Sequence, residues 1–196
     1  SDVCSSDLAL EFNKMADSIV LSESMLQEQA KHQENESRKT RLLLEEVARS
    51  QVRNGEEMAE VFNQALVGTR EILEVDRLVL YRLNPDGSGF IATESVAWNW
   101  PSTLNERIED PCIPQQLLNL YANGRIAPTP DVFKANFHPE HLQLMERLQI
   151  KASLAAPILH DGQLFGLLIA HHCAKTHKWQ PFEIDFMRQL AVQFGV

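Results

Sequence analysis

The chain has 196 residues, of which 44% are hydrophobic and 23% charged, and its formal net charge is −9. This composition is typical of a folded globular protein with one ordinary domain plus an appendage, and it excludes wholesale disorder. Lys and Arg form no basic stripe, so we expect neither nucleic acid nor an anionic membrane surface as a direct partner. The apolar runs fall far short of the ~20 residues that span a bilayer, and the N-terminus lacks a secretory-signal pattern.

The three cysteines, Cys4, Cys112 and Cys173, lie far apart and form no CxxC pair. This spacing argues against a disulfide framework and against a zinc ribbon, and it favours a reducing, cytoplasmic compartment. At the N-terminus, residues 3–8 (VCSSDL) resemble translated adapter DNA more than protein. We therefore treat residues 1–8 as an artefact or tag-like segment.

Residues 8–54 contain no Gly or Pro and are rich in Glu, Gln, Lys, Arg, Leu and Ala. Such a segment predicts one long helix or two stacked helices. An apolar seam with coiled-coil spacing runs along its first half and a shorter one lies near its end, whereas residues 29–38 offer almost nothing apolar. This pattern favours a parallel dimer, weakly paired in the middle, over an isolated solvated helix. The seam residues are Phe12, Met15, Ile19 and Leu26, followed by Leu43 and Val47.

Within this segment, residues 8–17 (LALEFNKMAD) resemble the closing part of a HAMP domain, whose second helix commonly ends in F-N-x-M-A. HAMP domains follow a transmembrane helix and pass its motion to cytoplasmic modules. The resemblance implies that residues 9–54 hold the C-terminal end of a HAMP domain and a signalling helix. It also implies that this chain is the cytoplasmic portion of an inner-membrane receptor.

From Gly55 onward the pattern changes, beginning with apolar residues at helical spacing between Met58 and Ile72. Two hairpins and further helices follow, which makes the expected fold class α+β, one antiparallel sheet with helices packed on its faces. The expected strands are 77–83, 90–97, 153–159 and 164–173, with turns at 84–89 and 160–163. The expected later helices are 115–121, 139–148 and 179–196, and an irregular stretch covers 98–114.

Several separate runs in residues 55–196 match one protein family. They are DRLVLYR (76–82), DPC (110–112), Y-x-x-G-R (121–125), DVF (131–133), QIKASLAAPI (149–158) and LFGLLIAHHC (164–173). On these runs the segment resembles the GAF domains of cyanobacteriochromes, the phytochrome-related photoreceptors of cyanobacteria. The resemblance implies the GAF fold and a sensory role for residues 55–196, preceded by the long coiled-coil-like helix.

The family's usual chromophore attachment is not retained. In these proteins a linear tetrapyrrole is held by a thioether from a Cys that immediately precedes a His on the second helix. Aligned through residues 149–151, this pair falls on Glu140 and His141. A carboxylate cannot form the thioether, so the usual covalent attachment is excluded.

The resemblance assigns roles to other residues if a bilin binds. Asp110 would accept hydrogen bonds from pyrrole N–H groups, His141 would stand beneath the rings, and His171 would lie near the outermost ring carbonyl. Cys112 resembles the family's second cysteine, which can add to the central bridge of the bilin as a thiolate.

Simpler interpretations of these residues stay open. A lone Cys in a Pro-flanked segment, as Cys112 is, is more often a passive, partly buried thiol than a nucleophile. Residues 171–173 put only two ligands on one face of a strand, and residues 138–141 form a weak motif, so we expect no metal site. No nucleophile, second carboxylate or phosphate-binding loop accompanies Glu140, so we expect no catalytic residues. The N-K…F…D-E signature of cyclic-nucleotide-binding GAF domains does not appear.

The sequence thus predicts a non-catalytic sensory and relay module of a cyanobacterial receptor for chemotaxis or phototaxis, or less favourably of a sensor histidine kinase, without a covalent cofactor. We expect a homodimer through the N- and C-terminal helices, acting on the parent receptor's output domain and its signalling proteins. The alternative is a bilin-binding photoreceptor domain that holds a linear tetrapyrrole such as phycocyanobilin noncovalently or through Cys112.

Overall fold

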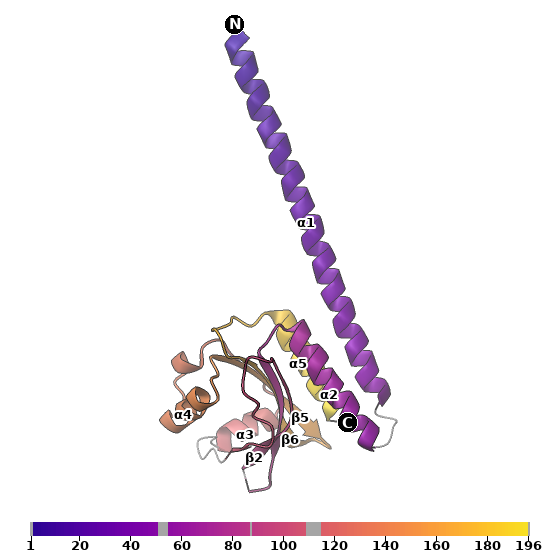
Figure 1. Ribbon diagram of the computed structural model, residues 1–196, viewed down its shortest axis with the longest axis vertical. Coiled ribbons are helices and arrows are strands. Elements are labelled where there is room, and N and C mark those ends of the chain that lie inside the picture. Colours follow the sequence, from indigo (N-terminus) through magenta and orange to yellow (C-terminus); the bar gives the residue numbers. More distant parts are fainter. Residues whose placement is uncertain (1, 51–54, 87, 109–114, 196) are drawn as a thin grey trace. The chain divides into compact units, whose positions relative to one another are not determined.

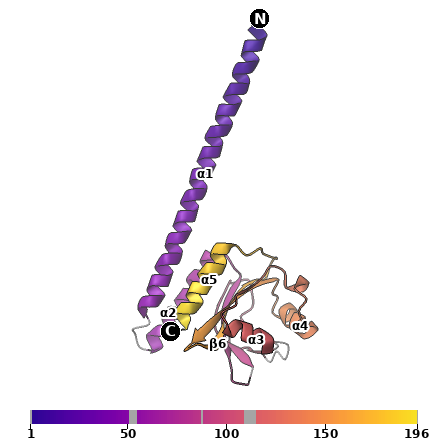
Figure 2. The ribbon, with the colours of Figure 1, turned by 180° about the vertical axis from the view of Figure 1, so that it is seen from behind.

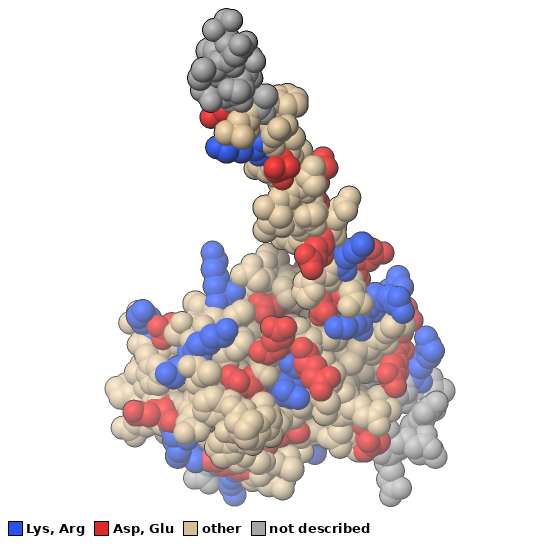
Figure 3. Space-filling view, turned by 45° about the horizontal axis from the view of Figure 1, so that its top comes forward, with Lys and Arg blue, Asp and Glu red and all other residues tan. Residues whose placement is uncertain are grey.

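A computed structural model describes the backbone of residues 2–50, 55–86, 88–108 and 115–195. The chain divides into two compact units, residues 1–41 and residues 42–196, and each is described here by itself. No helix among the described residues is both long and apolar enough to cross a membrane. On the face that Figure 3 shows, Lys and Arg side chains are interspersed with Asp and Glu.

A single helix, α1 (Asp2–Ser50), forms the first unit and the beginning of the second (Figure 1). It confirms the prediction of one long helix as far as Ser50. The predicted seam residues Phe12, Met15, Ile19 and Leu26 are between 54% and 72% exposed in the single chain. Val47, in contrast, is 1% exposed and belongs to the core of the second unit.

The second unit is built around a six-stranded antiparallel sheet with the strand order β3-β2-β1-β6-β5-β4. The two predicted hairpins are confirmed, and they meet where β1 pairs with β6 at the centre of the sheet. The strands are β1 (Arg77–Leu83), β2 (Gly89–Val96), β3 (Arg107–Ile108), β4 (Ala127–Thr129), β5 (Ala152–His160) and β6 (Gln163–His172).

The two faces of the sheet carry different helices (Figures 1 and 2). Helices α2 (Gly55–Ile72) and α5 (Pro181–Phe194) cover one face and form the main hydrophobic core with it. Helices α3 (Gln115–Ala122) and α4 (Pro139–Arg147) lie on the opposite face. Because side chains alternate along a strand, the core residues Leu78 and Leu80 face α2 and α5, while Val79 and Tyr81 face the other way.

The stretch predicted to be irregular, residues 98–114, contains the short strand β3. Strand β4 and a 3₁₀ turn, η1 (Val132–Lys134), also went unpredicted. These elements have two or three residues each and take their order from neighbours distant in sequence, such as β5 for β4. A period of two residues cannot be recognised over so short a run.

Candidate functional site

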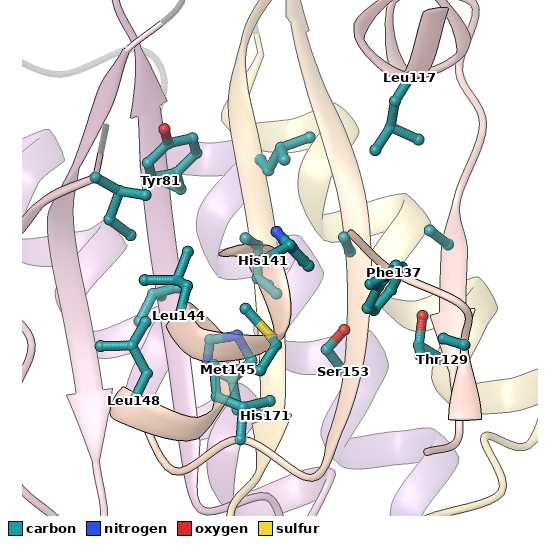
Figure 4. A pocket seen from close by; sticks show the side chains of 18 of the residues that line it. Tyr81, Leu117, Thr129, Phe137, His141, Leu144, Met145, Leu148, Ser153 and His171 are labelled. Carbon is teal, nitrogen blue, oxygen red and sulfur yellow. The ribbon is translucent and has the colours of Figure 1, made fainter. Parts of the chain in front are cut away.

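A cavity of about 390 Å³ lies between the sheet and the segments that contain α3 and α4. Figure 4 shows Tyr81 and Leu117 at one end of it, Leu148 and His171 at the other, and His141 between them. Its walls come from alternate residues of β1, β5 and β6, because only every second side chain of a strand points to this face.

The described lining is mostly apolar, with a few polar groups placed among aliphatic and aromatic side chains. This composition and size are typical of small-molecule sites, whose few polar groups orient the ligand. The polar or titratable members are Tyr81, Tyr121, Arg125, Thr129, His141, Ser153 and His171.

His171 is the more deeply buried of the two histidines that line the cavity, with 5% of the residue exposed. Burial, together with the positive charge of Arg77, lowers the pKa of His171 to about 3, so the imidazole is neutral at physiological pH. Its Nδ1 is buried and has no hydrogen-bond partner among the described residues. A neutral imidazole with an unsatisfied nitrogen in a cavity wall is suited to a hydrogen bond with a polar, uncharged ligand atom.

His172, the next residue of β6, faces the other way, as the alternation along the strand predicts. Its ring lies 4.3 Å from that of His177 and 5.4 Å from that of Trp179, centroid to centroid. His177 Nε2 lies 2.9 and 3.0 Å from the two carboxylate oxygens of Glu183, which is 3% exposed. The same carboxylate accepts a hydrogen bond of 2.5 Å from the backbone N–H of Gln180, the N-cap of α5.

Arg77 is a charged side chain on the cavity face of β1, and it is wholly buried. Its Nε lies 3.3 Å from Oε1 of Glu94, whose side chain is also buried. Its Nη1 donates to the carbonyl oxygen of Leu148 at 3.0 Å, and its Nη2 donates to that of Pro101 at 2.9 Å. Arg77 therefore joins β1 to the C-cap of α4 and to the loop that follows β2.

The five residues predicted for the site do not form one described cluster. His141 and His171 both line the cavity, from α4 and β6. Glu140 lies beside His141 in the first turn of α4, is exposed, and is not part of the lining. Asp110 and Cys112 lie outside the described residues.

Sequence reasoning assigned no role to several residues that the structure brings to the cavity, among them Tyr81, Tyr121 and Arg125. All three stand in runs that were recognised as family-like. Arg77 is a charged residue at the start of the predicted strand 77–83. A charge that is buried with its strand needs polar partners, so this residue could have indicated a buried polar network.

The described histidines, cysteine and acids contain no group of three or more arranged to hold a metal ion. Cys173 is a buried free thiol whose pKa is raised to about 11 by burial, so it stays protonated. A protonated buried thiol is a weak nucleophile and a poor metal ligand.

Residues 57–196 match the GAF domain family. Over 137 residues the chain is 39% identical to sll0041 of Synechocystis sp., which carries the name of a methyl-accepting chemotaxis protein. That alignment covers 70% of this chain and 14% of the relative, so the chain spans only a small part of it.

Two solved structures illustrate the similarity of fold. The blue-light absorbing form of the PixJ GAF domain from Thermosynechococcus elongatus is 38% identical, with a TM-score of 0.66 over 68% of this chain and 80% of that one. The phycocyanobilin-bound GAF domain of a cyanobacterial phytochrome has a TM-score of 0.71 at 24% identity, over 80% of this chain and 91% of that one. At that identity the second likeness concerns the fold alone.

Proposed function

The chain belongs to the GAF domain family, and we propose that it is the sensory module of a multidomain receptor whose cavity takes a linear tetrapyrrole without a thioether to residue 140. The observation that carries this proposal is the mostly apolar cavity with a neutral, unsatisfied imidazole, His171, in its wall. The proposal assigns no reaction to the chain.

The residues present fit a ligand of this class. A linear tetrapyrrole is long, largely apolar and conjugated, and it carries uncharged ring N–H and C=O groups together with carboxylates. The lining offers apolar surface along its length and neutral hydrogen-bonding groups at His171 and Tyr121. Arg125, which is exposed at the cavity, supplies the positive charge that a ligand carboxylate needs.

When bound, such a group would supply absorption of visible light. The chain's own residues would bind and orient it. His171 would exchange a hydrogen bond with an uncharged polar atom, and His141 would contact the ligand from the α4 side. Two cavity-facing tyrosines, Tyr81 and Tyr121, are buried and add aromatic walls.

Residue 140 distinguishes this domain from relatives that attach the ligand covalently. Glu140 is exposed in the first turn of α4, one residue before the lining residue His141. A Cys at this place would directly precede the lining residue His141, whereas a carboxylate offers no sulfur for a thioether. We therefore propose noncovalent binding, with attachment through Cys112 as the alternative.

The decisive experiment is the absorption spectrum of the protein produced in cells that make phycocyanobilin, followed by zinc-induced fluorescence on a denaturing gel. We expect a visible band in the native protein and no fluorescence after denaturation. The variant Glu140→Cys in a Cys112→Ala background should gain fluorescence on the gel, and Glu140→Gln in the same background is the matched control. Fluorescence of the unmodified protein that Cys112→Ala removes would instead establish attachment through Cys112.

The absence of a visible band in both the unmodified protein and the Glu140→Cys variant would overturn the tetrapyrrole proposal. The relay function would then stand by itself. It has separate support in the exposed apolar seam of α1, which favours a parallel homodimer that transmits a conformational bias. We propose, from the sll0041 likeness and the HAMP resemblance, that the parent is a membrane receptor of the chemotaxis type.

A further inference from the structure

Leu148 and His171 lie at one end of the cavity (Figure 4). Arg77 donates to the carbonyl oxygen of Leu148 but is not part of the described lining. In the ladder between β1 and β6, Arg77 is directly opposite His171. Directly opposed side chains of neighbouring strands point to the same face and lie close together. The guanidinium therefore stands near the imidazole at this end of the cavity, and its charge acts on the ring.

Three contacts fix this guanidinium from different parts of the chain. Besides the contact with Glu94, it donates to the carbonyl oxygens of Leu148 at 3.0 Å and Pro101 at 2.9 Å. Leu148 is the C-cap of α4 and also lines the cavity. The planar guanidinium can satisfy several acceptors at once, which a lysine ammonium at the same place cannot do with the same geometry.

Glu94 is itself held in place by the loop after β2. Its carboxylate accepts hydrogen bonds from the backbone N–H of Thr103 at 2.9 Å, from the Thr103 hydroxyl at 2.6 Å, and from the hydroxyl of Ser102. The ion pair between Arg77 and Glu94 is thus part of a continuous polar network. This network runs from the loop after β2, through β2 and β1, to the end of α4.

We propose that Arg77 is a positioning residue for the cavity: it fastens the Leu148 end of α4 to the sheet and holds a fixed positive charge beside His171, so that a ligand meets the imidazole and this end of α4 in a fixed place. This inference rests on the proposed function in so far as the cavity takes a ligand. Arg77 acts through His171 and Leu148 and does not touch the ligand itself.

The charged groups around His171 support this role. Among the described residues, Arg77 of β1 is the one whose charge acts on His171, and that charge adds to burial in lowering its pKa. Strand β5 places the uncharged Ser153 opposite His171 on the other side. Helix α4 contributes His141 to the same cavity.

The test compares three variants of the ligand-free protein. Arg77→Gln combined with Glu94→Gln removes both charges together and avoids a lone buried carboxylate. Arg77→Lys keeps the charge but not the fork of hydrogen bonds. Arg82→Gln is the matched control, because Arg82 is on the same strand but lies over Phe165 on the opposite face.

In the double variant we expect the titration midpoint of His171, followed by NMR of its imidazole, to rise by about one pH unit or more. We expect Arg77→Lys to leave that midpoint in place but to speed amide exchange at Leu148 and Ile150 by about tenfold or more. Arg82→Gln should change neither. An unchanged midpoint in the double variant, or unchanged exchange in Arg77→Lys, would overturn the proposal.

If the double variant does not fold, Arg77→Lys still tests the proposal through amide exchange and phycocyanobilin binding. We expect its dissociation constant for phycocyanobilin to rise by about threefold to tenfold at every pH. Failure of the unmodified protein to bind phycocyanobilin would count against the proposed function. The titration and amide-exchange measurements on the ligand-free protein would still test the positioning role of Arg77.

Discussion

Gly89, the first residue of β2, leaves the space that the phenol end of Tyr81 occupies. A Cβ at position 89 would overlap the ring carbon and hydroxyl oxygen of Tyr81 and the backbone carbonyl of Arg82. Tyr81 is buried and lines the cavity, so the absence of a side chain at Gly89 allows Tyr81 to take its position in the cavity wall.

Replacement of Gly89 by Ala should therefore displace Tyr81 and destabilise the domain by roughly 1–3 kcal/mol, the usual cost of overpacking. Denaturant unfolding measures this cost, and phycocyanobilin binding should weaken alongside it. In a Tyr81→Leu background the same replacement should cost clearly less, because the overlapping atoms of Tyr81 are gone and only the contact with the Arg82 carbonyl remains. Equal costs in the two backgrounds would show that Tyr81 is not the residue that Gly89 accommodates.

Stability should fall in acid because two histidines are held neutral. Burial and nearby positive groups lower the pKa of His171 to about 3 and that of His172 to about 4, against about 6.5 in the unfolded chain. Below pH 6.5 the unfolded state binds more protons than the folded state. The contribution of the two neutral histidines to the free energy of unfolding is therefore complete above pH 6.5 and is lost as the pH falls toward 4 and 3. For His172 alone the loss is roughly 3 kcal/mol.

The variant His172→Phe keeps an aromatic ring against His177 and Trp179 but removes the titrating group. The fall in stability between pH 6.5 and 4 should become shallower, as measured by urea unfolding at a series of pH values. His32→Gln, at an exposed position of α1, is the control and should leave the profile unchanged. An equally steep fall in His172→Phe would rule out His172 as a source of the acid sensitivity.

The first turn of α5 should depend on Glu183. This buried carboxylate accepts from Gln180 at the N-cap and from His177, and the variant Glu183→Ala leaves both donors without their acceptor. We expect a loss of roughly 1–3 kcal/mol in the free energy of unfolding and faster amide exchange in the first turn. Asp185→Asn, at an exposed position two residues further on, should have little effect on either quantity.

The apolar seam of α1 predicts self-association. Replacing Phe12 and Ile19 together by Asp should dissociate the dimer that we expect, because charges at seam positions oppose coiled-coil packing. Analytical ultracentrifugation measures this effect, and a monomeric unmodified protein at high concentration would contradict the prediction.

Replacing Gln29 and Gln33 by Leu should have the opposite effect: it should strengthen the dimer and lock signalling in the full receptor. Unchanged receptor output in this variant would contradict the prediction.

The sequence was sufficient for the long elements of the fold and for part of the site. Apolar periodicity predicted α2 and the two hairpins, and alternation along a strand correctly placed His171 and His172 on opposite faces. The pair Arg77 and Glu94 could not be predicted, because a shift of register within the β1–β2 pairing decides which residues oppose each other. A cavity is likewise the outcome of packing between distant segments, which periodicity does not report. The roles of Asp110 and Cys112 stay predictions.

A single peptide unit joins His171 to His172, and through them the cavity to the beginning of α5. Side chains of neighbouring residues in a strand point to opposite faces of the sheet. His171 therefore lines the cavity, while the ring of His172 lies against His177, which contacts the carboxylate of Glu183 in the first turn of α5. A ligand that displaced the backbone of β6 at His171 would displace His172 as well, and with it the contact to the first turn of α5.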